Sequence, residues 1–235
     1  MGFRPKLWPT LFTVPALIAL VFLGSWQVNR LHWKDTLIER LQERGTAAPV
    51  ALPTWIDNVE AYEFRRVSVT GEYLHGKEFY VINRSLNGKP GLNIVTLLKR
   101  ADDGGHVLVN RGWVPFEKRD PQTRLEGQVK GSVIVEGIVR LAKGPAMFTP
   151  ENEPHNNTWF HIDPSSMTTT AGLPPLQGYY ILAANKSPGG VPVGHQWRVD
   201  LLNNHLHYAI TWFALAFGLL VIYIVYHRQT KNRPD

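Results

Sequence analysis

Two histidines stand at the start of a long apolar stretch. The segment NNHLHYAITWFALAFGLL runs from Asn203 to Leu220 and holds His205 and His207 just before a run of uncharged residues. Imidazole nitrogens are common metal ligands, so either histidine is a candidate ligand at a membrane surface. The alternative is that both are polar residues that mark where a membrane helix begins. Residues two apart on a helix point about 200° away from each other, so at most one of the two histidines can ligate a given metal ion.

Two uncharged stretches of the chain have the length of a membrane span. Leu7 to Val28 and His205 to Tyr226 each contain 22 residues and no charged side chain. At about 1.5 Å per residue each helix spans roughly 33 Å, enough for a hydrocarbon core of about 30 Å. The first stretch is alternatively a cleaved signal peptide, but GSWQVNR follows it where a small-residue cleavage site is expected, which favours an uncleaved anchor. Aromatic residues near the ends suit interfacial belts: Trp8, Trp26, Trp212 and Tyr226.

The charges around the second span set the predicted orientation. Three basic residues follow this span directly and one lies just before it, so its C-terminal end is expected in the cytoplasm. The basic residues around the first span indicate the opposite orientation, but more weakly. Two spans then place both termini in the cytoplasm and the segment between them outside. Because no long mitochondrial presequence precedes the first span, the expected location is the bacterial inner membrane.

Composition disfavours several classes of function. The chain has 235 residues, a net charge of +6 and no cysteine, so disulfides, thiolate nucleophiles, cysteine zinc sites and covalent c-type haem attachment are excluded. Its basic residues are scattered singly, which disfavours nucleic-acid binding. The sequence contains no G-x-S-x-G, no H-E-x-x-H and no P-loop motif, so an enzyme is not the favoured interpretation.

The segment between the spans changes from helical to strand periodicity. RLHWKDTLIERLQERG has apolar residues at near-helical spacing and predicts an amphipathic helix that ends at Gly45. DPSSMTTTAG predicts a short helix with Asp163 as its cap and Gly172 as its stop. The remaining runs are rich in Val, Ile, Tyr and Phe and are separated by turn residues, as expected of strands. They are FRRVSVTGEY, KEFYVINRS, GLNIVTLLKR, HVLVNRGWV, SVIVEGIVRL, NTWFHI and GYYILAANK.

The predicted fold class is a membrane protein in which two transmembrane α-helices flank a mainly antiparallel β domain, sandwich or barrel-like, with short helices. The predicted organisation is a cytoplasmic N-terminus at 1–6, transmembrane helix 1 at 7–28, an extracytoplasmic β-rich domain at 29–204 that includes the amphipathic helix at 29–45, transmembrane helix 2 at 205–226, and a cytoplasmic basic tail at 227–235.

One strand of this domain carries an unusual polar residue. In LVNRGWVP, Arg111 is followed by Gly112 and Trp113, so its guanidinium could stack on an aromatic face or pair with a carboxylate. The alternative is a strand end with a glycine bulge. Arg111 and Trp113 are candidate partner contacts. The other histidines are dispersed and are interpreted as surface or turn residues: His32, His75, His106, His155, His161 and His195.

Several motifs together resemble the surfeit-locus (Surf/Shy) family of cytochrome c oxidase assembly factors. The resemblance is to the bacterial type of this family. GSWQVNRLHWK matches the family pattern G-x-W-Q-x-x-R-x-x-W-K, and VNRGWVP and PENEPHNNTWFHID follow in the same order. NNHLHYAITWF matches the frame N-x-H-L-x-Y-x-x-T-W. The resemblance covers nearly the whole chain.

The resemblance implies a role in assembling haem-copper oxidase. A member of this family is expected to receive haem a from haem a synthase and to present it to the nascent oxidase catalytic subunit. The histidine of the N-x-H-L frame is the family's proposed haem contact, and here it is His205. With no cysteine in the chain, haem binding would be non-covalent.

Helix geometry and depth extend this candidate site. His205 shares a helix face with Tyr208, Ala209, Trp212 and Ala216, where a flat macrocycle could lie. The outer ends of both spans face the same side, so Trp26, Gln27 and Arg30 are expected at similar depth, with Arg30 available to a haem propionate. Two alternatives stay open. His205 only hydrogen-bonds at the helix entry, or the protein is a scaffold that stabilises oxidase assembly intermediates and binds no haem.

Overall fold

The structure is a computed structural model that describes residues 5–184, 186–194 and 203–229. These residues form two compact units, a helical unit from residues before 40 and after 199, and a β domain from the residues between. His195 and most of the basic residues used to orient the second span lie outside the described residues.

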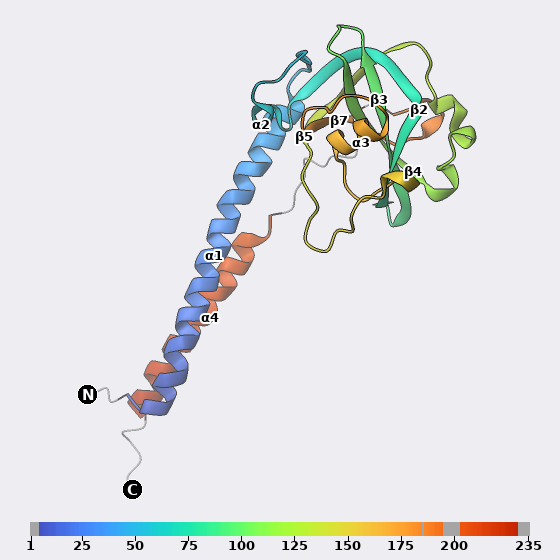
Figure 1. Cartoon of the computed structure of the whole chain (residues 1–235). Coiled ribbons are helices and arrows are strands. Elements are labelled where there is room, and N and C mark those ends of the chain that lie inside the picture. The colour runs from blue at the N-terminus through green and yellow to red at the C-terminus, as the bar shows by residue number, and fades with distance from the viewer. Residues whose placement is uncertain (1–4, 185, 195–202, 230–235) are drawn as a thin grey trace. The chain divides into compact units, whose positions relative to one another are not determined.

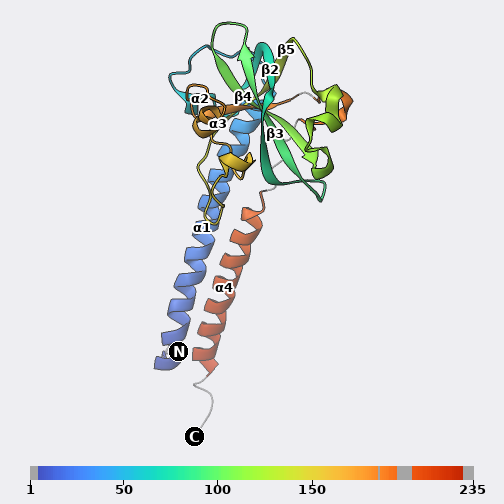
Figure 2. The ribbon, with the colours of Figure 1, turned by 45° about the vertical axis from the view of Figure 1, so that its right-hand side comes forward.

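The helical unit consists of two helices that lie side by side in both views (Figures 1 and 2). Helix α1 runs over Leu7–Thr46 and helix α4 over His205–Gln229. Both contain a stretch apolar and long enough to cross a membrane, so they are candidate spans at the positions predicted from the sequence. The predicted span at 7–28 and the predicted amphipathic helix at 29–45 are one continuous helix, because no residue between them breaks the helical pattern.

Small residues bring the two helices together. Gly24 of α1 lies so close to α4 that a Cβ atom at this position would be 2.8 Å from the ring of Phe213. On α4, Ala209 and Ala216 are buried, although most large apolar side chains of the helix are exposed. This is the pattern of membrane helix pairs, in which small residues let the backbones approach and large ones face lipid.

The β domain contains one mixed, mostly antiparallel sheet of seven strands. Its strands are β1 Val50–Ala51, β2 Arg66–Leu86, β3 Lys89–Arg100, β4 His106–Pro115, β5 Ser132–Leu141, β6 Thr158–Trp159 and β7 Tyr179–Ala183. Two of the predicted strands, 64–73 and 77–85, are parts of the single long strand β2, which accommodates the turn-like residues between them as an irregularity between Tyr73 and Glu78.

The sequence left a sandwich and a barrel as alternatives, and the sheet is a regular example of neither. Pairing runs in the order β1-β2-β3-β4-β7-β5, and β5 also pairs with β2, so the sheet curls back on itself (Figure 2). The β4–β7 contact is parallel and joins only two residue pairs, Val109 with Ile181 and Asn110 with Leu182. Sequence periodicity identifies strands but not their partners, so the sequence could not decide how the sheet closes.

Short helices complete the domain. Helix α2 covers Val59–Tyr62, and helix α3 covers Pro164–Thr170 with Asp163 accepting a hydrogen bond from the backbone of Ser166, as predicted for a cap. Gly172 follows α3 with a φ of 71°, in agreement with its predicted role as a helix stop. Four 3₁₀ turns lie at Phe116–Lys118, Pro121–Gly127, Pro154–Asn156 and Pro188–Gly190.

The core of the domain lies on both faces of β3 and β4, whose residues are almost all buried. One cluster includes Val67, Leu98 and Val109. A second packs Trp159 and Met167 of α3 against Phe79 and Leu97. Burial on both faces accounts for the near-continuous apolar runs of these strands.

Candidate functional site

The first candidate site lies at the start of α4, where a polar contact joins the two helices. His205 Nδ1 is 2.7 Å from the side-chain oxygen Oε1 of Gln27 on α1. His205 is partly exposed there. Gln27 and His205, which the sequence places at similar depth, are therefore in direct contact.

This contact sets the tautomer of His205. An amide oxygen only accepts hydrogen bonds, so His205 Nδ1 carries the proton and donates it to Gln27. Neutral imidazole then has its lone pair at Nε2, for which no hydrogen-bond partner is present among the described residues. A histidine whose second nitrogen is held by a hydrogen bond is the usual arrangement of a metal-ligating imidazole. The same contact also fulfils the simpler expectation that His205 hydrogen-bonds at the helix entry, so the two interpretations are compatible.

A second polar contact lies just before α4. The Asn203 side chain donates from Nδ2 to Asp35 Oδ1 at 2.7 Å, and the same nitrogen is 3.4 Å from the backbone oxygen of Leu31. Gln27, Leu31 and Asp35 are four residues apart and therefore share one face of α1. The start of α4 is thus tied to α1 through both Asn203 and His205.

The other predicted site residues lie near this contact along α1 and α4. Trp26 and Arg30 are exposed on α1, and the Arg30 guanidinium lies 4.5 Å from the centre of the Trp33 ring. On α4, Tyr208 is exposed and Trp212 is partly exposed. Of the predicted set, the structure therefore brings His205 and Gln27 into contact, and leaves the aromatic residues and Arg30 accessible.

A self-contained metal centre is absent from the described part of the chain, in which no three His, Cys, Asp or Glu side chains gather as metal ligands. One imidazole with a free Nε2 fits instead a group that brings its own equatorial ligands, as a haem does. The exposed aromatic side chains near it suit a flat apolar ring.

The prediction that Arg111 and Trp113 contact a partner is wrong for this structure, because both side chains are buried within the β domain. Arg111 makes both of the contacts proposed for it: its guanidinium lies 4.7 Å from the centre of the Tyr73 ring and its Nη1 is 3.3 Å from Glu78 Oε1. Gly112 has a φ of 117° and lies at a register shift between β3 and β4, so the glycine bulge is also present.

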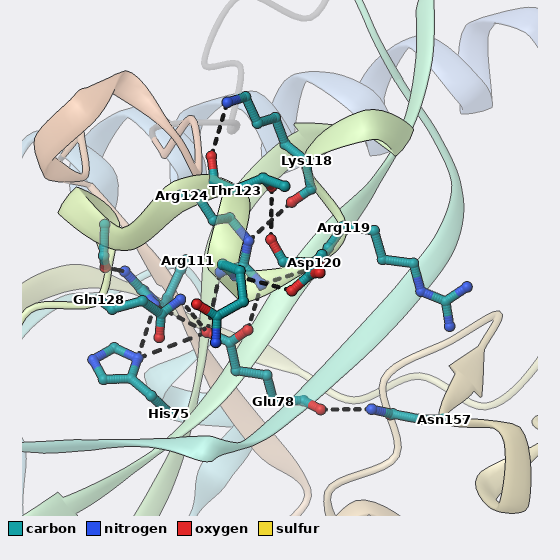
Figure 3. A network of polar contacts seen from close by, with 12 residues as sticks. His75, Glu78, Arg111, Lys118, Arg119, Asp120, Thr123, Arg124, Gln128 and Asn157 are labelled. Atoms are coloured by element: carbon teal, nitrogen blue, oxygen red, sulfur yellow. Dashed lines mark hydrogen bonds and ion pairs between the residues drawn. The ribbon is translucent and has the colours of Figure 1, made fainter.

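Arg111 belongs to a buried polar cluster centred on Glu78 (Figure 3). Arg124 donates to both carboxylate oxygens of Glu78, at 3.2 and 2.5 Å. Gln128 donates to Oε1 at 3.2 Å, and His75 Nδ1 lies 3.7 Å from the same oxygen. Both guanidinium groups also donate to backbone carbonyls, Arg111 to Gly127 and Arg124 to Lys118 and Arg119.

These contacts determine the ionisation of Glu78. Burial acts to raise the pKa of its carboxyl group, but contacts with His75, Arg124 and Gln128 outweigh burial and lower the pKa from 4.5 to about 2. Burial also lowers the pKa of Arg111. The guanidinium nevertheless stays charged at neutral pH, because the ordinary pKa of arginine is very high. The cluster is a saturated ion pair network that joins β2, β4 and the 3₁₀ turn at Pro121–Gly127. Because the carboxylate oxygens of Glu78 are already hydrogen-bonded within the domain, the cluster has a structural role.

Sequence reasoning missed this cluster, although one signal was available. Glu78 alternates with Tyr80 and Ile82 along β2, so the carboxylate lies on an apolar face of the strand. A buried carboxylate requires cationic partners, but their identity depends on strand pairing and on the turn near Arg124. His75 is also part of the cluster, contrary to its interpretation as a surface residue.

Together, the fold and the contacts define a class of protein with two candidate membrane spans and one mixed β domain between them in the sequence. The SURF1 family model matches residues 14–217, so the chain belongs to the SURF1 family. It is 38% identical over 211 residues to Surfeit locus protein 1 of Takifugu rubripes, covering 83% of this chain and 86% of the relative. It is 36% identical over 222 residues to the SURF1-like protein of Monosiga brevicollis, covering 90% of this chain and 84% of the relative.

Surfeit locus protein 1 of Homo sapiens is 38% identical over 211 residues, covering 83% of this chain and 69% of that protein. The resemblance noted from the motifs is therefore confirmed at the level of the family. These three relatives are eukaryotic, so they lend no support to a specifically bacterial type.

Proposed function

We propose that this protein is a non-enzymatic membrane assembly factor for haem-copper cytochrome c oxidase. In this proposal it binds haem a transiently, receives it from haem a synthase and assists its insertion into the oxidase catalytic subunit. Membership of the SURF1 family supports the role in oxidase assembly. The observation that supports haem binding is the contact between Gln27 and His205, which leaves His205 Nε2 with a lone pair.

Each residue of the candidate site has a distinct part in this proposal. His205 provides one axial nitrogen to the iron, and Gln27 acts as a positioning residue because it holds the ring through Nδ1. Trp26, Tyr208 and Trp212 offer apolar and aromatic contacts to the macrocycle. Arg30 offers a guanidinium to a propionate. The bound haem would supply the iron and its equatorial nitrogens, whereas a single protein ligand favours ready release.

We place the protein in a membrane through α1 and α4, with the lipid bilayer in contact with their apolar side chains. The proposed location is the bacterial inner membrane, with both termini cytoplasmic and the β domain periplasmic. The support for this orientation is the cluster of basic residues after the second span. Nucleic acid is not among the proposed partners.

The first test is the visible absorption spectrum of the protein purified in detergent after co-expression with haem a synthase. We expect a haem a band in the wild type and in His207→Ala, and its loss in His205→Ala. His207 is a matched control because it is two residues away on the same helix and its side chain is exposed. Loss of the band in both variants would show that the segment as a whole, rather than one axial ligand, holds the haem.

The positioning role of Gln27 has its own readout. We expect Gln27→Leu to weaken haem affinity by about 10- to 100-fold, because the imidazole loses the acceptor that holds its Nδ1. Gln27→Glu keeps an acceptor at the same place and should retain haem. If Gln27→Leu binds haem as tightly as the wild type, Gln27 has no positioning role.

If no variant and no wild-type sample carries haem while the synthase is active, haem binding is refuted. The scaffold function then remains, in which the chain stabilises oxidase assembly intermediates. In that case His205→Ala should leave oxidase haem content unchanged.

A further inference from the structure

The β domain contains a cavity that is separate from the candidate haem site. Its volume is about 370 Å³, at the lower end of the range for small-molecule sites. Four basic side chains line it, and no Asp or Glu is among its lining residues. The four are Arg84, Arg140, Lys143 and His161. The amides of Asn93 and Asn110 and the side chain of Tyr180 also line it.

The cationic side chains come from separate parts of the chain. Arg84 is on β2, Arg140 is on β5, and Lys143 and His161 lie in the loops that follow β5 and β6. Glu63 does not line the cavity but forms an ion pair with Lys143, at 3.7 Å from its Nζ. One carboxylate does not balance the three permanent charges of Arg84, Arg140 and Lys143. The cavity therefore has a positive potential that favours an anion.

Two of the lining groups present unused hydrogen-bond donors. Arg140 Nε and His161 Nδ1 are buried and have no hydrogen-bond partner among the described residues. His161 Nε2 is 3.3 Å from the amide nitrogen of Asn152, which only donates, so Nε2 is the acceptor and Nδ1 carries the proton. A buried donor without a partner costs about 1–3 kcal/mol, so such groups usually have a water or ligand partner.

Other contacts hold these side chains in place without using these two donors. Arg84 donates to the backbone oxygens of Asn83 and Phe160, at 3.3 and 3.2 Å. The Arg140 guanidinium lies 5.0 Å from the centre of the Phe64 ring. Asn152 accepts hydrogen bonds from the backbone of Phe160 and His161 at 2.8 and 3.2 Å, which fixes the loop that carries His161.

The cavity also holds one unused acceptor. Asn93 Oδ1 is buried without a hydrogen-bond partner among the described residues, and the residue is only 7% exposed. An oxygen acceptor is satisfied by a donor such as a hydroxyl group, which an ionised carboxylate or phosphate group does not provide. A ligand that matches both kinds of group carries an anionic group and a donor such as a hydroxyl.

We propose that this cavity binds a small hydroxylated anion, either a hydroxycarboxylate or a phosphate monoester that carries a hydroxyl, with its charged group at Arg140 and His161 and its hydroxyl at Asn93. The guanidinium fork of Arg140 matches either carboxylate or phosphate oxygens. This site is independent of haem binding and of the helical unit.

The test is the thermal unfolding of the full-length protein in detergent, titrated at constant ionic strength with malate, succinate or glycerol 3-phosphate. We expect a saturable rise in the unfolding temperature with malate, with glycerol 3-phosphate, or with both, and the comparison of these two probes identifies the charged group. Succinate lacks only the hydroxyl of malate and should bind at least about tenfold more weakly, if malate binds.

Variants assign the effect to the cavity. Arg140→Gln should weaken binding at least about tenfold, whereas Arg140→Lys retains the charge and should bind with intermediate affinity. Arg65→Gln is the matched control, because Arg65 is an exposed arginine of the same domain that does not line the cavity. His161→Phe removes the donor while keeping an aromatic ring, so it tests the site even if Arg140→Gln is unstable.

Two results would overturn the proposal. One is the absence of a saturable shift with all three probes in the wild type. The other is an equal shift in Arg140→Gln, His161→Phe and the wild type, which would place the anion elsewhere. An equal response to succinate and malate would remove the hydroxyl requirement at Asn93.

Discussion

At the scale of single residues, the carboxylate of Glu78 has the clearest energetic role. It is 6% exposed and faces two buried arginines, one of which, Arg124, donates to both of its oxygens. Removing one partner of a buried ion pair leaves uncompensated charge in a medium of low polarity. The cluster therefore specifies how the turn near Arg124 docks on the sheet.

We predict that Glu78→Gln lowers the free energy of unfolding by about 3 kcal/mol or more at neutral pH. Glu72→Gln, an exposed change on the same strand, should alter it by less than about 0.5 kcal/mol. Chemical denaturation of the two variants in detergent measures the difference. Equal stability of Glu78→Gln and the wild type would show that the ion pairs add nothing to folding.

The same residue predicts a pH dependence. The folded pKa of Glu78 is about 2, below its ordinary value of 4.5, so its ionised form favours the folded state. Its contribution is complete above about pH 4.5 and disappears as the pH falls towards about 2, a loss on the order of 3 kcal/mol. Over this pH range, the free energy of unfolding should fall more steeply with decreasing pH in the wild type than in Glu78→Gln. Parallel curves would contradict the low pKa.

At the scale of elements, Gly24 determines how closely α1 approaches α4. A Cβ at Gly24 would lie 2.8 Å from the Phe213 ring, whereas a Cβ at Gly218 meets nothing within 4 Å. Both alanine substitutions raise helix propensity equally, so their difference reports packing. We predict that Gly24→Ala is less stable than Gly218→Ala by about 1–3 kcal/mol. Thermal loss of the helical circular-dichroism signal in detergent measures this difference, and equal midpoints would mean that Phe213 moves aside freely.

Gly112 has a comparable role in the sheet. Its φ is 117°, and a Cβ would lie 1.9 Å from the backbone oxygen of Val193, which accepts a hydrogen bond from Trp113. We predict that Gly112→Ala lowers the free energy of unfolding by at least about 2 kcal/mol. Gly76→Ala is the control, because its Cβ would meet nothing within 4 Å. If both variants have the same free energy of unfolding as the wild type, the bulge tolerates a side chain.

At the scale of the whole molecule, the absence of cysteine makes the proposed orientation testable with single introduced thiols. Lys130 is exposed on the β domain, and Arg228 is exposed near the end of α4. We predict that a membrane-impermeant maleimide labels Lys130→Cys in intact cells and labels Arg228→Cys only after permeabilisation. The reverse pattern would invert the topology, and labelling of both before permeabilisation would contradict two spans.

Much of the local structure was predictable from the sequence. Uncharged runs identified α1 and α4, and alternating apolar residues identified the strands, because both signals depend on neighbours along the chain. The cap at Asp163 and the stop at Gly172 were predictable for the same reason. The two uncharged runs also predicted that Gln27 and His205 lie at similar depth, and a hydrogen bond joins these two side chains.

What the sequence by itself determined was thus the family, the two apolar helices and the β-rich segment between them. Only the tertiary structure decided that Arg111 is buried against Glu78, and that Arg140 and His161 line one cavity. The physical reason is that these contacts join residues from different strands and loops. Pairing of β3 with β2 and β4 brings Arg111 to Glu78, and pairing of β2 with β5 and β6 brings Arg140 to His161. Periodicity within one strand carries no information about its partners.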